Sequence, residues 1–145
     1  MGAAINALEP LEFDLDDILS RLMRDDDSPT TLIHELTWAR HHVYQARLSA
    51  VRVFDNIRTF GVMFLGSSRS LEDAHVEMKR ARAQMRDMEA HIAACLSPIT
   101  VIVSNRERPW KYADLWLQVH SRSHEAPKTI DTAIDSIMAA KPTAN

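Results

Sequence analysis

The stretch that decides the fold is LIHELTWARHHVYQARLSAVRVFDNIRTFGVMFL, residues 32–65. Its apolar side chains recur at alternating steps of three and four, which is the spacing of one stripe along a helix. Ser28 and Pro29 precede it, and a serine cap followed by proline in the first turn is a helix-start signal. We therefore expect one long helix over residues 29–65. Its predicted core stripe is Leu36, Ala39, Val43, Ala46, Ala50, Val53, Ile57, Phe60 and Phe64.

A second apolar stripe follows after a short interruption. Gly66-Ser67-Ser68 ends the first helix, and Ser70 with Asp73 three residues later forms an imperfect capping box for a helix over residues 70–97. Two helices joined by so short a loop fold back as antiparallel neighbours. The sequence thus predicts an all-α helical bundle built on a long antiparallel hairpin, residues 29–97. The second stripe is Leu71, Ala74, Met78, Ala81, Met85, Met88, Ile92 and Cys95.

The register of this hairpin is predicted from side-chain volume. A register that sets small residues opposite large ones satisfies close packing. The facing pairs in that register are Phe60–Met78, Ile57–Ala81, Val53–Met85, Ala50–Met88 and Ala46–Ile92. An alternative register stacks Ala50 on Ala81 and leaves a gap. The preferred register also faces Cys95 toward Val43.

The N-terminal segment carries most of the acidity of the chain. Net charge is −3, but residues 1–27 hold eight acids against Arg21 and Arg24, which gives −6 there and +3 in the remainder. Either a solvated helix or an acidic arm folded over a basic surface, its own or a partner's, explains this asymmetry. On the hairpin flank we expect an exposed ion pair between Arg47 and Glu89. An apolar stripe in the same acidic segment predicts a helix over residues 7–24: Leu8, Leu11, Leu15, Ile18 and Leu22.

Residues 98–145 predict shorter elements. The β-branched run of residues 99–103 favours a short buried helical turn, with a lone extended segment as the alternative, because no second strand pattern exists to pair with it. Pro109 begins a helix that ends near Arg122, and Ala126-Pro127 begins a last helix. The hairpin is therefore accompanied by three shorter helices. We expect a single all-α domain, residues 1–145, made of an acidic N-terminal helix and hinge (1–27), the hairpin (29–97) and the C-terminal helices (98–145).

The composition restricts the class of protein. A single cysteine, Cys95, excludes an intramolecular disulfide framework and favours a reducing compartment. No apolar run approaches the 18 or more residues of a membrane-spanning helix, and the acidic N-terminus is unlike a secretory signal. We expect a cytoplasmic protein that does not bind membrane.

Seven histidines raise the question of a metal site. Glu72 and His75 have the spacing used in di-iron bundles, but such sites need two of these motifs and the chain has one. His120 and His124 are four residues apart, with His124 expected near a helix end. On the hairpin, His34 and His41 share a helical face, and His42 can meet His91 across the hairpin. We predict no metal, no cofactor and no catalytic residue.

The sequence favours a non-enzymatic interaction or assembly subunit, because the helices are longer than a core of this size requires. The hairpin would offer an extended surface to a protein partner or to a second copy of the chain. In an assembly subunit we expect the first helix or the Trp110/Trp116 segment to cross to a neighbouring chain, so the candidate partner-binding residues are Leu11, Leu15, Ile18, Trp110 and Trp116. The alternative is a nucleic-acid-associated subunit that uses the basic helical face of Lys79, Arg82 and Arg86. A small helical enzyme or metal-binding protein that uses the histidines is the third hypothesis.

Overall fold

The computed structural model of the protein describes residues 1–60, 68–105 and 107–140, and this part of the chain contains helices and turns but no strand. The predicted all-α class is therefore confirmed for the described residues. The helices are α1 (Gly2–Arg24), α2 (Thr30–Phe60), α4 (Ser68–Ala94), α5 (Leu96–Ser104) and α6 (Ala113–Ala140). None of these described helices is long and apolar enough to cross a membrane.

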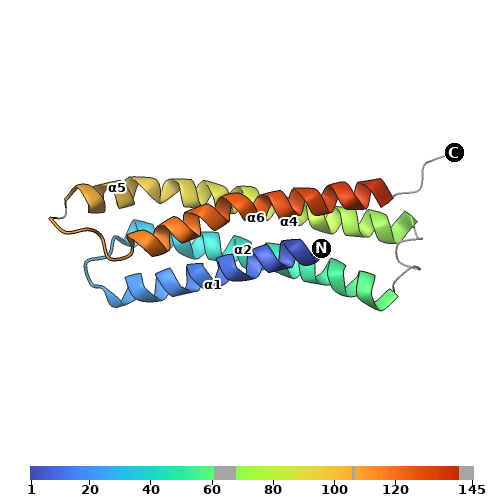
Figure 1. The fold of residues 1–145 in the computed structure, drawn as a ribbon, viewed down its shortest axis with the longest axis horizontal. Helices are drawn as coiled ribbons and strands as arrows, with labels where there is room; N and C mark the ends of the chain where they lie inside the picture. Colours follow the sequence, from blue (N-terminus) through green and yellow to red (C-terminus); the bar gives the residue numbers. More distant parts are fainter. Residues whose placement is uncertain (61–67, 106, 141–145) are drawn as a thin grey trace.

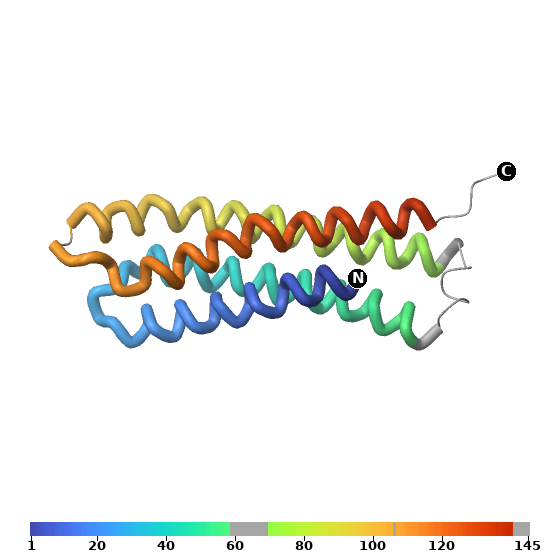
Figure 2. Tube along the Cα trace, viewed as in Figure 1, coloured from blue at the N-terminus to red at the C-terminus, as the bar shows by residue number. Residues whose placement is uncertain are grey.

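Helices α1, α2, α4 and α6 lie along the long axis of an elongated bundle, and the short α5 continues α4 at one end (Figure 1). The main packed pairs are α1 with α2, α2 with α4, α4 with α6 and α6 with α1, so these helices form a closed ring of neighbours (Figure 2). Their apolar stripes meet in one buried core. The largest fully buried side chains are Leu8, Leu11, Leu15, Ile18, Leu22, Leu32, Leu36, Leu71, Met78, Met85, Met88 and Ile130.

Polar pairs on the flank of α2 and α4 give the direction and register of these two helices. Three pairs join them: Glu35–His91, His42–Gln84 and Ser49–Glu77. In every pair the two residue numbers sum to 126, so one helix ascends as the other descends. The segment that connects them, residues 61–67, lies outside the described residues.

The predicted register is wrong. Its facing pairs sum to 138, a slip of 12 residues along one helix, or about 18 Å at the helical rise of roughly 1.5 Å per residue. Val53 lines a cavity with Ala74 rather than facing Met85, and Ile57 lines another with Leu71 and Ala74 rather than contacting Ala81. The rejected alternative, with Ala50 opposite Ala81, is closer to the observed register.

Two physical reasons explain the error. First, the core is not a seam between two helices: α1 and α6 also fill it, so an alanine opposite an alanine leaves no gap. Second, the polar pairs on the flank of α2 and α4 favour one register independently of side-chain volume in the core. The same slip separates the predicted pairs Cys95–Val43 and Arg47–Glu89. The Arg47 Nε instead lies 2.5 Å from Glu12 Oε2 on α1, and this hydrogen bond raises the pKa of Arg47.

Helix α1 begins at Gly2, five residues before the predicted start, and includes Pro10. Its predicted stripe is buried against the chain's own α2 and α6. The acids beside the stripe pair with bases of other elements, as in Glu12–Arg47, Asp16–Arg40, Asp14–Arg122 and Asp25–Lys111. The uneven charge of the sequence is thus used within the chain, because the acidic helix packs on basic positions of its own bundle.

The C-terminal part is helical as predicted but differs from the prediction in its details. Residues 99–103 are helical within α5, but only Ile99 and Ile102 are buried, whereas Val101 and Val103 are more than half exposed. The helix predicted to begin at Pro109 begins at Ala113. The predicted break between two short helices is absent, because α6 runs from Ala113 to Ala140 and includes Pro127. Proline removes one backbone hydrogen bond from a helix. Here a continuous buried stripe on both sides of Pro127 outweighs that loss: Trp116, Val119, Ser123, Ala126, Ile130, Ala133, Ile134 and Ile137.

Candidate functional site

The best-developed surface feature is a cluster of five aromatic and imidazole rings on α2 and α4, which we call the imidazole face: His34, Trp38, His41, His42 and His91. Trp38 is at its centre and contacts the other four rings. Its side chain is 45% exposed, unusual for a tryptophan in a chain whose other two are 5% and 6% exposed. The ring is therefore available at the surface.

The rings of the imidazole face form a partly ordered stack. His42 and His91 come from different helices, with centroids 5.4 Å apart and an interplanar angle of 14°. Trp38 lies 6.1 Å from His42 and 6.3 Å from His91, at angles of 29° and 17°. His34 and His41 meet the Trp38 ring edge-on. Such offset and edge geometries are favourable for aromatic rings.

Hydrogen bonds fix the two stacked imidazoles. His91 Nδ1 lies 2.5 Å from Glu35 Oε2, and His42 Nδ1 lies 2.6 Å from Gln84 Oε1. Because both partner oxygens accept, both Nδ1 atoms carry the proton in these bonds. Each bond crosses from one helix to the other. The fold itself therefore fixes the orientation of the two imidazole rings beside Trp38.

The predicted partner-binding residues are in the core. Leu11, Leu15 and Ile18 are fully buried, while Trp110 and Trp116 are nearly so. These five side chains therefore have no exposed surface for a partner in this fold. A role in association would require α1, or the segment with Trp110 and Trp116, to be exchanged between copies. That exchange remains a prediction.

Trp38 was missed as a candidate, although the sequence carried a signal for it. It falls between core positions Leu36 and Ala39 and off their stripe, so its ring faces outward. A large aromatic residue on the polar side of a helix is costly to expose. Three histidines lie three or four residues from Trp38 on the same helix: His34, His41 and His42.

The basic residues of the nucleic-acid alternative share one face of α4. Lys79 and Arg86 are exposed and Arg82 is half-buried. Within the described part of the chain none of the three is in an ion pair, whereas the neighbouring Arg80 contacts Glu77. Glu77 also accepts a hydrogen bond of 2.8 Å from Ser49 and contacts Arg52, beside a cavity of about 400 Å³.

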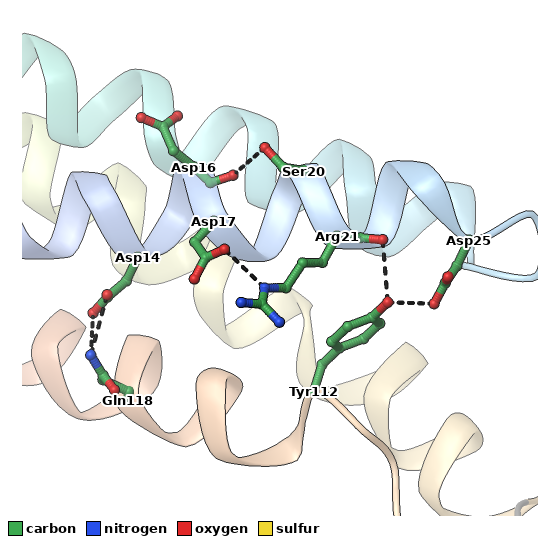
Figure 3. Close-up of polar contacts among 8 residues, drawn as sticks. All are labelled: Asp14, Asp16, Asp17, Ser20, Arg21, Asp25, Tyr112 and Gln118. Atoms are coloured by element: carbon green, nitrogen blue, oxygen red, sulfur yellow. Dashed lines mark hydrogen bonds and ion pairs between the residues drawn. The ribbon is translucent and has the colours of Figure 1, made fainter.

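A buried carboxylate joins α1 to α6 (Figure 3). Asp14 is 4% exposed and accepts hydrogen bonds from Gln118 Nε2 at 3.1 and 3.2 Å. The guanidinium of Arg122 donates to Asp14 at 2.5 Å and to the carbonyl oxygen of Pro10 at 3.4 Å. The bonds from Gln118 and Arg122 satisfy the Asp14 carboxylate within the fold, so we interpret this cluster as structural.

A second polar cluster closes the end of α1 (Figure 3). The Tyr112 hydroxyl donates to Asp25 Oδ2 at 2.5 Å and to the carbonyl oxygen of Arg21 at 3.3 Å. The hydrogen bond to Asp25 raises the pKa of Tyr112. Lys111 Nζ lies 2.9 Å from the same carboxylate, which raises the pKa of Lys111. These contacts attach the turn before α6 to the C-terminal end of α1, where Asp25 caps the helix.

The remaining chemistry-bearing side chains are not members of the imidazole face, although the Cys95 thiol donates a hydrogen bond of 3.3 Å to the backbone oxygen of His91. Among the described residues, no group of three or more His, Cys, Asp or Glu side chains is arranged to hold a metal ion. Glu72 is exposed and His75 half-buried on α4. Cys95 is fully buried, as predicted, and burial together with the nearby Glu35 charge raises the pKa of its thiol to about 12. A thiol with that pKa is a poor nucleophile near neutrality.

Comparison with known proteins adds no relationship to these observations. The chain matches no family model, no curated protein and no solved structure.

Proposed function

We propose that the chain is a non-enzymatic helical interaction subunit, and that its α2–α4 hairpin presents the imidazole face to a protein partner. The observation that carries this proposal is the half-exposed Trp38. Binding energy at protein interfaces concentrates in a few residues, and tryptophan is prominent among them.

The setting of Trp38 supports the proposal. Its ring contacts histidines from both helices, and two of those histidines are hydrogen-bonded across the hairpin. An anchor whose neighbours are already ordered loses less conformational entropy on binding. The imidazole face is thus preorganised.

The surface next to Trp38 also suits a protein side chain. A shallow depression of about 320 Å³ is lined by Thr37, Arg40, His41 and Tyr44. Tyr44 is 41% exposed, so a second aromatic residue is available beside the first. Tyrosine, tryptophan and arginine are the residue types enriched in protein interfaces. A helix or extended segment of a partner would place an apolar side chain here.

The test uses two matched variants, Trp38→Ala and Leu117→Ala. Leu117 is 61% exposed on α6, so both changes remove a large exposed side chain and leave the core intact. A photoreactive phenylalanine derivative at position 38 identifies the partner in the native cell, and the purified partner is then titrated with each variant. Sedimentation at several concentrations reports association of the chain with itself.

We expect Trp38→Ala to weaken partner binding or self-association by on the order of thirtyfold, as for a hot-spot residue. Leu117→Ala should bind like the parent chain. Equal affinities for the parent and Trp38→Ala would refute the proposed face. So would adducts that form equally well from position 117.

One observation favours a second candidate, a nucleic-acid-associated subunit. Lys79, Arg82 and Arg86 lie on one helical face without acidic partners among the described residues. Phosphate contacts by such residues make affinity fall steeply with salt. Retention of single- or double-stranded nucleic acid that weakens with salt, and weakens further in Lys79→Ala/Arg86→Ala, would favour this candidate. Salt-independent or absent retention would exclude it.

A further inference from the structure

Helix α6 brings two histidines together on one face, away from the imidazole face. His120 and His124 are four residues apart, and α6 continues for 16 residues beyond His124 to Ala140. His124 is therefore in the interior of a regular helix. The sequence predicted it near a helix end, and that prediction is wrong. The two ring centroids are 4.6 Å apart, with the ring planes at 88°.

Both imidazoles retain nitrogen atoms that are free to bind a ligand. Within the described residues no hydrogen bond engages a ring nitrogen of either histidine, and the Ser123 hydroxyl bonds only to the backbone oxygen of His120. His124 is exposed and His120 is half-buried, so solvent reaches the pair. By contrast, His42 and His91 each use one ring nitrogen in a hydrogen bond between helices.

We propose that His120 and His124 chelate one first-row transition-metal ion, namely Cu²⁺, Ni²⁺ or Zn²⁺. Imidazole nitrogens bind these ions at about 2.0–2.1 Å, so two donors on one ion lie roughly 3.3 Å apart. Rings one helical turn apart with centroids at 4.6 Å reach that separation by side-chain rotation alone. Two histidines at this spacing on one helix face also supply ligands in helical zinc motifs.

The coordination sphere would be incomplete on the protein side. Two donors fall short of the four protein ligands of structural zinc sites and of the three of catalytic sites, so water or an outside ligand fills the other positions. The order of affinities for imidazole places Cu²⁺ first. The site is thus an open chelate on the surface of α6 and not a closed structural centre.

A tryptophan beside the pair supplies a built-in reporter. The Trp116 ring centroid is 5.7 Å from that of His120. A paramagnetic Cu²⁺ ion held by His120 would quench Trp116 emission. Trp38, the tryptophan of the imidazole face, is replaced by phenylalanine to remove the emission from that distant surface.

The experiment titrates CuCl₂ into the full chain carrying Trp38→Phe and follows fluorescence, with calorimetry for stoichiometry. Electron paramagnetic resonance of the Cu²⁺ complex counts the bound nitrogens. The test variants are His120→Gln and His124→Gln, and the control is the double variant His34→Gln/His41→Gln, which removes two histidines from α2. Circular dichroism verifies that each variant has the helicity of the parent.

We expect saturable quenching with one Cu²⁺ per chain and two imidazole nitrogens on the metal. Each α6 variant should bind at least about tenfold more weakly, because loss of one donor removes the chelate effect. The α2 control should bind like the parent. Unchanged affinity in both α6 variants, or loss of binding in the α2 control alone, would overturn the proposal. A Cu²⁺ spectrum with a single nitrogen, or no saturable quenching, would overturn it as well.

Discussion

Glu35 Oε2 and His91 Nδ1 lie 2.5 Å apart and join α2 to α4 near the end of the bundle that carries α5. His42–Gln84 and Ser49–Glu77 repeat the contact at intervals of seven residues along both helices. A seven-residue step returns nearly to the same face of a helix, so the three pairs form a ladder on one flank. Polar contacts of this kind select one register among those that the apolar stripe permits.

We predict that a double-mutant cycle of Glu35→Ala and His91→Ala gives a coupling of about 0.5–1.5 kcal/mol in the free energy of unfolding. The pair is only partly exposed, with side chains 25% and 29% accessible, so it should exceed a solvated ion pair. Urea denaturation measures the four stabilities. The exposed pair Glu125–Lys128 is the control, expected at about 0.5 kcal/mol or less. A Glu35–His91 coupling no larger than the control would show that the ladder does not set the register.

The elements of the fold were predictable because they depend on local spacing. Steps of three and four among apolar residues located α1, α2 and α4, and burial agrees with every stripe residue from Leu71 to Cys95. Helix α6 was predicted as two pieces because Pro127 is a strong local stop signal. A buried stripe continuing from Trp116 to Ile137 overrides that signal, and such tertiary support is not visible in a local window.

The relative placement of the elements was not predictable in the same way. The register depends on which side chains of all four helices pack together at the same height along the bundle. A pair such as Ile57 and Ala81 involves only two of those helices. The imidazole face also depends on the relative placement of the helices, since His42 bonds to Gln84 and stacks on His91, both of which are on α4. The sequence showed that His42 and His91 could meet across the hairpin, but it did not show that Trp38 contacts both rings.

We predict that Arg122→Ala lowers the free energy of unfolding by roughly 1–3 kcal/mol. The change leaves the carboxylate of Asp14, 4% exposed, without its charged partner, and the remaining bonds from Gln118 do not neutralise it. Urea denaturation measures the effect. Arg21→Ala is the matched control because Arg21 and its partner Asp17 form an exposed ion pair, so its loss should change stability much less than the loss of Arg122. Equal losses in the two variants would mean that Asp14 is not buried as described.

We predict that Cys95 reacts slowly with thiol reagents in the native chain and lowers stability at alkaline pH. Burial raises the pKa of its thiol from 9.0 to about 12, so the folded chain keeps a proton that the unfolded chain loses. The contribution to stability is fully present below pH 9 and is lost as pH rises from about 9 toward 12.

The measurement is urea denaturation of the parent and of Cys95→Ala at pH 7, 9 and 11. Cys95→Ala should be less stable than the parent at pH 7, because it leaves a small cavity, yet should lose less stability between pH 9 and 11. Tyr112 titrates in both chains, so its effect cancels in the comparison. Labelling of native Cys95 within seconds would contradict the predicted burial of the thiol.

Helix α1 either belongs to the core of its own chain or is exchanged between copies, and the stability of α1 variants distinguishes the two. Leu15 and Phe13 lie two residues apart on α1, but Leu15 is fully buried and Phe13 is 70% exposed. Leu15→Ala should lower the free energy of unfolding by about 2–5 kcal/mol, whereas Phe13→Ala should stay within roughly 0.5 kcal/mol of the parent. Deletion of residues 1–24 should remove the remaining helicity of the bundle, because α2 and α6 would then expose the apolar surfaces that α1 covers.

Each of these stabilities is measured at several protein concentrations. A helix packed within its own chain gives midpoints that do not change with concentration, while a helix exchanged with a second copy gives midpoints that rise with it. Rising midpoints in the parent, together with an intact helical bundle after the deletion, would return Leu11, Leu15 and Ile18 to the interface between chains. Constant midpoints leave them in the core and leave Trp38 as the anchor of association.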